Sequence, residues 1–280
     1  MTKLVDLHSH SDQSDGSLTP EELVDHAVES GLGVLALTDH DTTSGHARFK
    51  ARAAERGLTP VCGVEVSCTW DPGVCHLLGL GVEHEHPALE PALREIRGGR
   101  ARRNERIVEK LNDLGYDVTM DEIIAEAGGG DVVARPHFAA VLVGKGLVPE
   151  YQMVFDQLLA KGGPAYVDRF RLDPEEAVEL VVKAGGKPVI AHPTSLMLES
   201  AELERRLRRL KEHGLWGLEA WYTGFTDEQV AEFRALAASL DLVTTMGSDF
   251  HGTPKPHVIM GHRAPGVPLP GPVPAELLPA

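Results

Sequence analysis

Two histidines near the start of the chain, His8 and His10, lie two positions apart in a short alternating stretch that begins at Val5. Alternate side chains of a strand point to the same face, so both imidazoles would project from one side. Asp12 and Asp15 follow in the loop, where their carboxylates could join or orient a metal site. Because histidine pairs also occur at ordinary strand ends, this interpretation depends on whether similar groups recur.

Similar groups do recur where later apolar segments end. They are His40 after residues 32–38, Glu65 within 59–66, His76 within 75–81, His192 after 188–191, and Asp249 and His251 after 242–247. A glutamate in an apolar segment is costly to bury unless it is paired or bound to a cation. This set of nitrogen and oxygen ligands, without a thiolate, predicts a site for Mn, Fe or Zn.

The elements that would position these groups alternate between strand and helix. The capping box Thr19-Pro20-Glu21-Glu22 predicts the start of the first helix. Further helices are expected at residues 44–56, 174–184, 199–213 and from 226 onward, and a short strand at 165–167. Repeated strand-helix units predict a parallel sheet, and about seven strands favour a closed barrel. Barrels of this kind carry their chemistry on the loops after the strands.

Residues 87–163 interrupt the alternation, because they have helical patterns only. We interpret them as a helical insertion between two parts of an α/β barrel, residues 1–86 and 164–263. Residues 264–280 are rich in proline and glycine and are expected to form an extended tail that adds little to the core.

Composition limits the class of protein. A chain of 280 residues with 42% apolar content can bury a large core. It has neither an apolar run long enough for a membrane span nor a signal-peptide pattern, so a cytoplasmic location is expected. Cys62, Cys68 and Cys75 are odd in number and form no Cys-x-x-Cys pair, which favours reduced thiols. A net charge of -15 argues against a protein that coats nucleic acid, and no stable DNA complex is expected.

Successive motifs resemble those of the PHP (polymerase and histidinol phosphatase) family. They are Asp6-Leu7-His8-Ser9-His10 with Ser14-Asp15-Gly16, Thr38-Asp39-His40-Asp41, Gly63-Val64-Glu65, His76, Ala191-His192-Pro193 and Gly247-Ser248-Asp249-Phe250-His251. The helical insertion and residues 134–139 resemble a stand-alone bacterial branch that acts on nucleoside 3′,5′-bisphosphates or, as a 5′-to-3′ exoribonuclease, on short RNAs. The resemblance implies a distorted seven-stranded (β/α) barrel, the PHP fold, with a trinuclear metal centre.

The resemblance also implies a division of the ligands among up to three ions, with Mn expected first and Fe or Zn as alternatives. His8, His10, Glu65 and Asp249 would hold one ion; Glu65 would bridge to a second held by His76 and His192; and Asp15, His40 and His251 would hold a third.

The expected activity is that of a metal-dependent phosphoesterase. Clustered divalent cations neutralise phosphate oxygens and lower the pKa of a bound water from about 15.7 towards 7. We therefore expect in-line attack by a metal-bridging hydroxide, with Asp249 essential and His192 or His251 protonating the leaving group. The expected substrates are the 3′-phosphate of nucleoside 3′,5′-bisphosphates and short 5′-phosphorylated RNA. Histidinol phosphate or another small phosphoester is the alternative substrate, and a non-catalytic regulator stabilised by metal is the alternative function.

Arginines of the helical insertion are candidates for binding a second phosphate. Arg103 and Arg106, three positions apart, could form a bidentate clamp, and the resemblance adds Arg135 and His137. We interpret Arg94, Arg97, Arg100 and Arg102 as a solvated basic face, and the mixed charges of residues 202–212 as an ordinary exposed face. Asp12, Asp39 and Asp41 are expected to orient ligands or turns.

Overall fold

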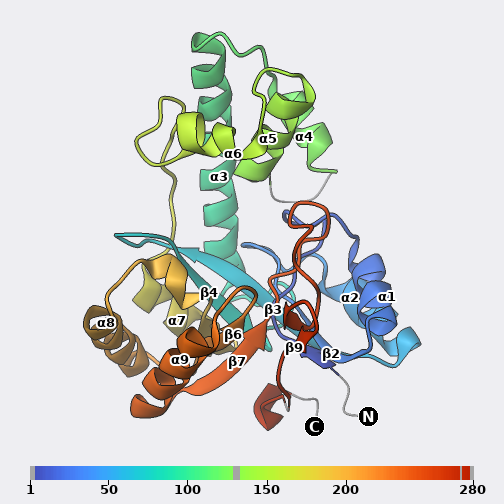
Figure 1. Ribbon diagram of the computed structural model, residues 1–280, viewed down its shortest axis with the longest axis vertical. Helices are drawn as coiled ribbons and strands as arrows, with labels where there is room; N and C mark the ends of the chain where they lie inside the picture. The colour runs from blue at the N-terminus through green and yellow to red at the C-terminus, as the bar shows by residue number, and fades with distance from the viewer. Residues whose placement is uncertain (1–3, 129–132, 272, 278–280) are drawn as a thin grey trace.

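The computed structural model describes residues 4–128, 133–271 and 273–277. Its main feature is one seven-stranded sheet whose strands follow chain order (Figure 1). The strands are β1 (Leu4–Asp6), β2 (Leu32–Leu37), β3 (Thr59–Cys68), β4 (Cys75–Leu80), β5 (Lys187–Ile190), β6 (Gly217–Tyr222) and β7 (Val243–Gly247). Alternating strands and helices thus form the mixed α/β architecture that the sequence predicts.

The two edges of this sheet meet just beyond β1 and β7. Leu7 N donates to Met246 O at 3.1 Å, His10 N to Phe250 O at 2.9 Å, and Asp249 N to His8 O at 2.9 Å. These backbone hydrogen bonds bring the first and last predicted ligand segments side by side, although the first segment lies near the start of the chain and the last lies near its end.

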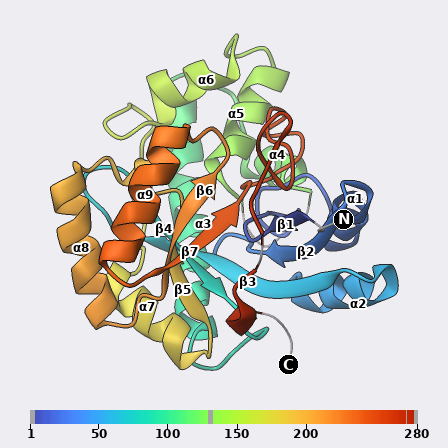
Figure 2. The ribbon, with the colours of Figure 1, turned by 60° about the horizontal axis from the view of Figure 1, so that its bottom comes forward.

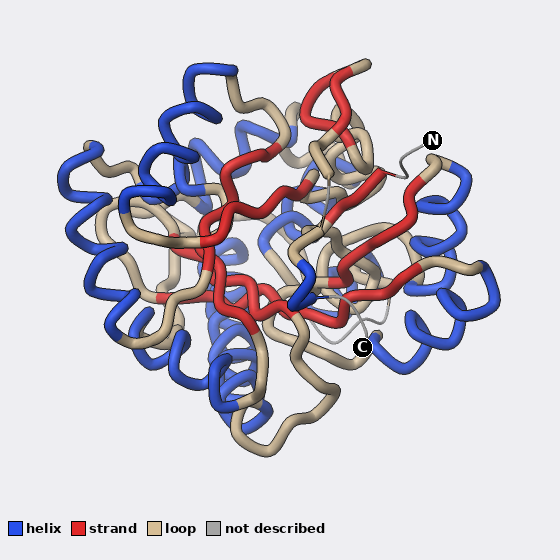
Figure 3. Tube along the Cα trace, turned by 90° about the horizontal axis from the view of Figure 1, so that it is seen from below, coloured by secondary structure: helices blue, strands red, loops and turns tan. Residues whose placement is uncertain are grey.

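Helices surround the strands, as the view from below shows (Figure 3). They are α1 (Pro20–Glu29), α2 (His46–Arg56), α7 (Pro174–Lys183), α8 (Ser200–Glu212) and α9 (Asp227–Ser239). Thr19 forms the predicted capping box with Glu22, and α1 buries Leu23, Val24 and Ala27. One apolar face therefore fixes each helix against the sheet and leaves the loops at the strand ends free to carry ligands.

Strand β4 corrects the prediction of an all-parallel sheet. It runs antiparallel to both β3 and β5, because a tight loop joins it to β3. His76 therefore lies near the start of its strand, not at the end. Since β4 runs in the opposite direction, its start lies at the same edge as the ends of its neighbours, where Glu65 and His192 also lie.

The strand expected at residues 165–167 is also wrong. This segment is a loop, and Ala165 and Val167 pack in the core of the helices that follow β4 and precede α7 in the chain. That core belongs to α3 (Glu90–Asp113), α4 (Met120–Glu126), α5 (Arg135–Gly144), α6 (Tyr151–Val154) and the π-helix η1 (Phe155–Leu159). In Figures 1 and 2 these helices stand above the sheet, and the long helix α3 connects the two parts.

Helix α3 shows how the two parts are joined. Its first half buries Leu93 and Ile96 in the core beside the sheet, and its second half buries Ile107 and Leu111 in the helical core. We propose on this basis that residues 87–163 are an insertion that the barrel carries on one long helix.

The C-terminal segment does not behave as the expected tail. β8 (His262–Ala264) pairs with β9 (Val267–Pro268), and a 3-10 turn, η3 (Ala275–Leu277), follows. Leu269, Val273 and Leu277 are buried in the same cluster as Val5 and Val61. The expectation that this segment adds little to the core is therefore wrong, because its apolar residues cover one end of the sheet.

Cys62, Cys68 and Cys75 are all free thiols, as the sequence predicts. Among the described residues, none of the helices is both long and apolar enough to cross a membrane.

Candidate metal centre

The predicted ligands meet at one edge of the sheet, and the most buried group joins β1 to β3 and β7. His8 Nε2 lies 3.4 Å from both Glu65 Oε2 and Asp249 Oδ1. His10 Nε2 lies 3.2 Å from the same two oxygens. Two ligands that are each about 2.1 Å from one cation, at angles of about 90 to 109°, lie about 3.0 to 3.4 Å apart. The four side chains therefore have the spacing of a single coordination shell.

Two further groups adjoin the first. Glu65 Oε1 lies 2.9 Å from His76 Nδ1 and 3.0 Å from His192 Nε2, while Glu65 Oε2 lies 3.0 Å from His40 Nδ1. In the third group, Asp15 lies 3.2 Å from His251 Nε2 and 3.6 Å from His40 Nε2. All nine predicted ligands thus come together, and Glu65 is shared between groups. His40 and His10 also border two groups each, which the sequence did not indicate.

The nine residues fit divalent cations by a second criterion. Five of their buried atoms have no hydrogen-bond partner in the part of the chain that the structure describes: His8 Nε2, His10 Nε2, His40 Nδ1, His76 Nδ1 and Glu65 Oε2. Leaving a buried donor or acceptor unpaired costs about 1–3 kcal/mol, so five in one place call for a binding partner. Nitrogen and carboxylate ligands in these groups support a divalent metal cofactor.

Electrostatics keep the central carboxylates ionised. Burial raises the pKa of Glu65, but the imidazoles of His40, His76 and His8 outweigh it and hold that pKa well below its usual value. Burial acts in the same way on Asp249, where Lys255, His251 and His8 lower the pKa well below normal. Both groups therefore have the charge that cation binding requires.

Glu219 of β6 holds two of the ligand segments, and the sequence analysis missed it. Its side chain is fully buried; Oε1 lies 3.0 Å from His8 Nδ1, and Oε2 accepts a hydrogen bond from His192 N at 2.7 Å. His192 needs this support because its φ of 26° is a strained conformation for a non-glycine residue. Gly247 leaves space for the contact between Glu219 and His8, because a Cβ at this position would lie 2.2 Å from His8 Cβ and 2.5 Å from Glu219 Oε1.

Three aspartates were expected to orient turns and ligands, and none of them belongs to the ligand groups. Asp39 accepts hydrogen bonds from Ser11 N at 2.8 Å and Ser14 Oγ at 2.6 Å, which fixes the loop after β1. Asp41 accepts from Ser67 N at 2.7 Å and pairs with Arg100. Asp12 accepts from Gln13 Nε2 at 2.7 Å.

An arginine-lined cavity of about 400 Å³ opens beside the metal centre. Asp15, His40 and His76 form part of its wall, and its cationic residues are Arg100, Arg103, Arg135, Lys161, Arg169 and Arg171. Arg103 and Arg135, two of the four substrate candidates, thus lie beside the metal centre. Arg106 and His137 are not among the described residues that line the cavity.

Two predictions about α3 need correction. The proposed clamp of Arg103 with Arg106 does not form, because Arg103 is buried while Arg106 lies on the exposed side of the helix. Arg100, interpreted as solvated, is 6% exposed and lies 2.6 Å from Asp41 Oδ2. The inward face of α3 is thus formed by Arg100 and Arg103. His137 instead accepts a hydrogen bond from Ala134 N at 3.1 Å, at the start of α5.

The cavity carries more positive charge than its carboxylates balance. Burial, followed by the nearby Arg100, lowers the pKa of Arg169 to about 9, although Asp41 opposes the shift. Burial and the neighbouring Arg100, Arg169 and Arg135 likewise lower the pKa of Arg103 well below its usual value. A bound anion would relieve this repulsion, because it favours the charged form of each guanidinium.

The chain is similar to known proteins over almost its whole length. A sequence model of the PHP domain matches residues 6–127. The chain is 36% identical over 273 residues to the 3′,5′-nucleoside bisphosphate phosphatase of Chromobacterium violaceum, covering 98% of this chain and 96% of that protein. The chain belongs to the PHP family.

Two other relatives span most of this PHP protein. It is 34% identical to the 5′-3′ exoribonuclease Rnm of Escherichia coli, over 93% of this chain and 89% of that protein. A solved structure from Bifidobacterium adolescentis, assigned to the metal-dependent phosphoesterases, superposes with a TM-score of 0.84 at 31% identity and covers 93% of this chain and 92% of its own. The chain is accordingly a PHP-family phosphoesterase, which is a hydrolase.

A second cavity of about 350 Å³ borders the PHP metal centre. It shares His40, Val74 and His76 with the arginine-lined cavity, and its remaining lining is Glu65, His192, Thr194, Ser195, Tyr222, Asp249 and Lys255. Tyr222 Oη donates to Asp249 Oδ2 at 2.7 Å, and Lys255 Nζ contacts the same oxygen. The sequence analysis identified neither Tyr222 nor Lys255.

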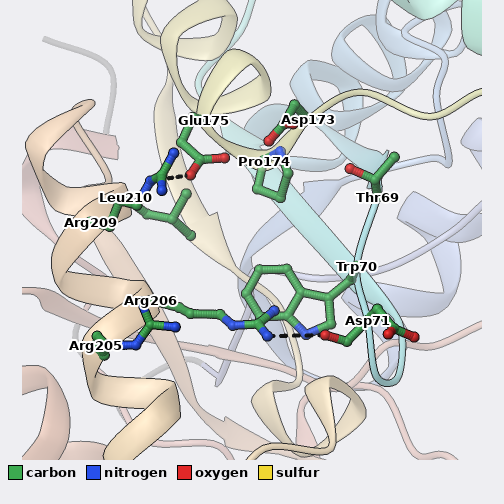
Figure 4. Close-up of a pocket in the computed structure, with 10 residues that line it drawn as sticks. All are labelled: Thr69, Trp70, Asp71, Asp173, Pro174, Glu175, Arg205, Arg206, Arg209 and Leu210. Atoms are coloured by element: carbon green, nitrogen blue, oxygen red, sulfur yellow. Dashed lines mark hydrogen bonds and ion pairs between the residues drawn. The ribbon is translucent and has the colours of Figure 1, made fainter.

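A larger groove of about 550 Å³ contains none of the predicted ligands (Figure 4). Its basic side chains already have partners: Arg206 lies 4.6 Å over the Trp70 ring, and Arg209 pairs with Glu175 at 2.6 Å. Arg205 and Arg206 both bond Glu202, as expected for a mixed-charge face on α8. This groove is therefore a surface of paired charges and not part of the centre.

Proposed function

We propose that this PHP-family hydrolase removes the 3′-phosphate from nucleoside 3′,5′-bisphosphates and trims short 5′-phosphorylated RNA. The observation that supports this most is the arginine-lined cavity, whose wall includes Asp15, His40 and His76 of the metal centre. A phosphate held by the arginines would place a second phosphate of the same molecule at the centre. The names of the Chromobacterium and Escherichia relatives describe substrates of these two kinds.

The proposed ligand sets are those that the geometry groups. The first cation would be held by His8, His10, Glu65 and Asp249. The second would be held by His40, Glu65, His76 and His192. The third would be held by His10, Asp15, His40 and His251. Divalent cations, of which we favour Mn over Fe or Zn, neutralise phosphate oxygens there and activate a water for in-line attack.

The proton for the leaving group does not come from His192 or His251 in this proposal. His192 Nε2 faces Glu65 at 3.0 Å and its Nδ1 lies 2.9 Å from Ser195 Oγ. His251 Nε2 faces Asp15 at 3.2 Å and its Nδ1 lies 2.8 Å from Asp249 O. Both nitrogens of each ring are thus engaged, which favours cation binding over proton transfer.

In this proposal, recognition of the second phosphate falls to Arg100, Arg103, Arg135 and Arg169. A guanidinium can bind a phosphate through two parallel hydrogen bonds, and the buried arginines lose little water on doing so. Arg169 also donates to Ser67 Oγ at 2.8 Å, which fixes its guanidinium near Asp41. A substrate with one phosphate would leave this cluster without an anion.

Histidinol phosphate or another small phosphoester remains the alternative substrate, because it needs the metal centre only. The alternative of a non-catalytic regulator is not retained, since the relatives that span the chain are enzymes by name.

The test compares phosphate release by Mn-loaded protein from adenosine 3′,5′-bisphosphate, 3′-AMP, 5′-AMP and histidinol phosphate. A 5′-phosphorylated RNA trinucleotide is scored in parallel for mononucleotide release. Asp249→Ala is the control for contaminating phosphatases and should show no turnover. Preference for the bisphosphate, with stepwise trimming of the RNA, supports the proposal, whereas preference for histidinol phosphate would refute it and leave the metal chemistry intact.

A further inference from the structure

We infer that the second cavity, lined by Thr194, Tyr222 and Lys255, binds the nucleoside that follows the scissile phosphate in an RNA chain. The inference rests on the proposed function and extends it, because it assigns a binding site for the part of the substrate that a bisphosphate lacks.

The two cavities are arranged on either side of a shared wall. They share His40, Val74 and His76, so they meet at the metal centre and otherwise have different walls. A nucleoside 3′,5′-bisphosphate with its 5′-phosphate on the arginines ends at the 3′-phosphate. It therefore has no group to place in the second cavity. A phosphodiester continues through O5′ of the next nucleotide and would fill that space.

The wall of the second cavity has the chemistry of a nucleoside site. Its volume of about 350 Å³ is within the range of small-molecule sites. Tyr222 offers an aromatic ring that is held in place, because its hydroxyl bonds Asp249 and its ring lies 5.5 Å from that of His192 and 5.2 Å from that of Phe225. Single-stranded RNA is commonly bound by stacking of bases on aromatic side chains beside cationic groups. Lys255, beside Tyr222, is the cationic group of this wall, and it also pairs with Asp249.

In this arrangement the shortened RNA is itself a new substrate. The oxygen of water bonds to phosphorus and the water gives up one proton, while the P–O3′ bond breaks and O3′ takes up one proton. The products are a 5′-mononucleotide and an RNA shortened by one nucleotide, which begins with a 5′-phosphate. That phosphate is the group that the arginine-lined cavity would bind in the next cycle.

Wild-type protein loaded with Mn provides the first test, with three substrates: adenosine 3′,5′-bisphosphate, its 3′-methyl phosphodiester and the dinucleotide pApA. Both diesters have the same scissile bond, and only pApA has a second nucleoside. We expect kcat/KM for pApA to exceed that for the methyl diester by about tenfold or more, as stacking of one base would give. Equal values, or a lower value for pApA, would overturn the inference.

The second test uses variants in which a larger side chain fills the second cavity. Thr194 is exposed on the cavity wall, so Thr194→Trp should lower the ratio of kcat/KM between pApA and the methyl diester by about tenfold. Thr194→Phe is a second variant with the same expected direction. Met197→Trp is the matched control, since Met197 is 70% exposed, three positions away and absent from the lining of both cavities among the described residues. Circular dichroism and bound Mn confirm that each variant is folded and loaded.

The outcomes separate the inference from the function on which it rests. If wild-type protein hydrolyses none of the three substrates, the proposed function fails. If it hydrolyses the bisphosphate and both diesters, but the Thr194 variants leave the ratio unchanged, only the assigned cavity is wrong. If the ratio of kcat/KM between pApA and the methyl diester fell equally in Met197→Trp, the assignment of this cavity would also be wrong.

Discussion

Replacing Glu219 with alanine should weaken metal binding without removing any of the predicted ligands. Its two oxygens hold His8 Nδ1 at 3.0 Å and His192 N at 2.7 Å, from a fully buried position. The carboxylate fixes the ring of His8 so that Nε2 faces Glu65 and Asp249, and it fixes the backbone of the strained His192. Partners of this kind typically contribute about 10- to 100-fold to metal affinity or activity.

The expected loss for Glu219→Ala is therefore about 1.4 to 2.8 kcal/mol in Mn binding, at 1.4 kcal/mol for each tenfold. Calorimetric titration with Mn, or competition with a chelator, measures it directly and does not depend on turnover. The variant must first be shown to fold, because it also leaves a buried backbone N–H without its acceptor.

Two controls sharpen this experiment. Glu219→Gln keeps an oxygen that can accept from His192 N but presents an amide in place of the second oxygen, so its affinity should be intermediate. Glu204→Ala removes an exposed carboxylate that pairs with Arg208 on α8, and it should leave Mn affinity unchanged. If folded Glu219→Ala binds Mn as tightly as wild type, Glu219 does not organise the centre and the reasoning is refuted.

Three further predictions follow from the same structure. Arg135→Ala should lower kcat/KM for adenosine 3′,5′-bisphosphate about tenfold or more relative to 3′-AMP. Arg106→Ala is the control and should not change this ratio, because Arg106 lies outside the cavity. Equal losses on both substrates in Arg135→Ala would contradict a role in binding the second phosphate. Removal of metal with a chelator should lower the melting temperature, and added Mn should restore it, because the ions bind the folded chain. Leu269→Ala should destabilise the fold by about 2–5 kcal/mol in denaturant unfolding, and Val267→Ala, at a position 38% exposed, by much less.

Most of the predicted metal ligands could be found from sequence because they lie at or near the ends of short apolar segments. Strand ends at one edge of a sheet must lie close together, so His8, His40, His192 and Asp249 converge whatever the details of the barrel. The direction of β4 could not be obtained in this way. A parallel and an antiparallel strand have the same apolar pattern, and only the short loop from β3 decides between them.

Glu219 and the C-terminal segment were missed for a different reason. Glu219, like Glu65, is a glutamate within an apolar strand, but its importance comes from contacts with His192 and with His8, which lies 211 positions away in the sequence. The composition of residues 264–280, which are rich in proline and glycine, does not say whether Leu269 and Leu277 find an apolar surface to cover. Burial of this kind depends on tertiary packing.

The arginine-lined cavity had one indication in the sequence that was not used. Gly98 and Gly99 lie inside α3, where glycine costs about 1 kcal/mol relative to alanine, so a packing reason should be sought. A Cβ on Gly99 would lie 3.0 Å from Phe170 Cβ, closer than such atoms normally approach. The glycine therefore allows the loop before α7 to lie against the helix, next to Arg100. That contact brings Arg169 within 3.8 Å of Asp41, the carboxylate that Arg100 also binds. Gly99 thus indicates which turn of α3, a helix of mixed charge with many arginines, faces inward, and the inward arginines follow from it.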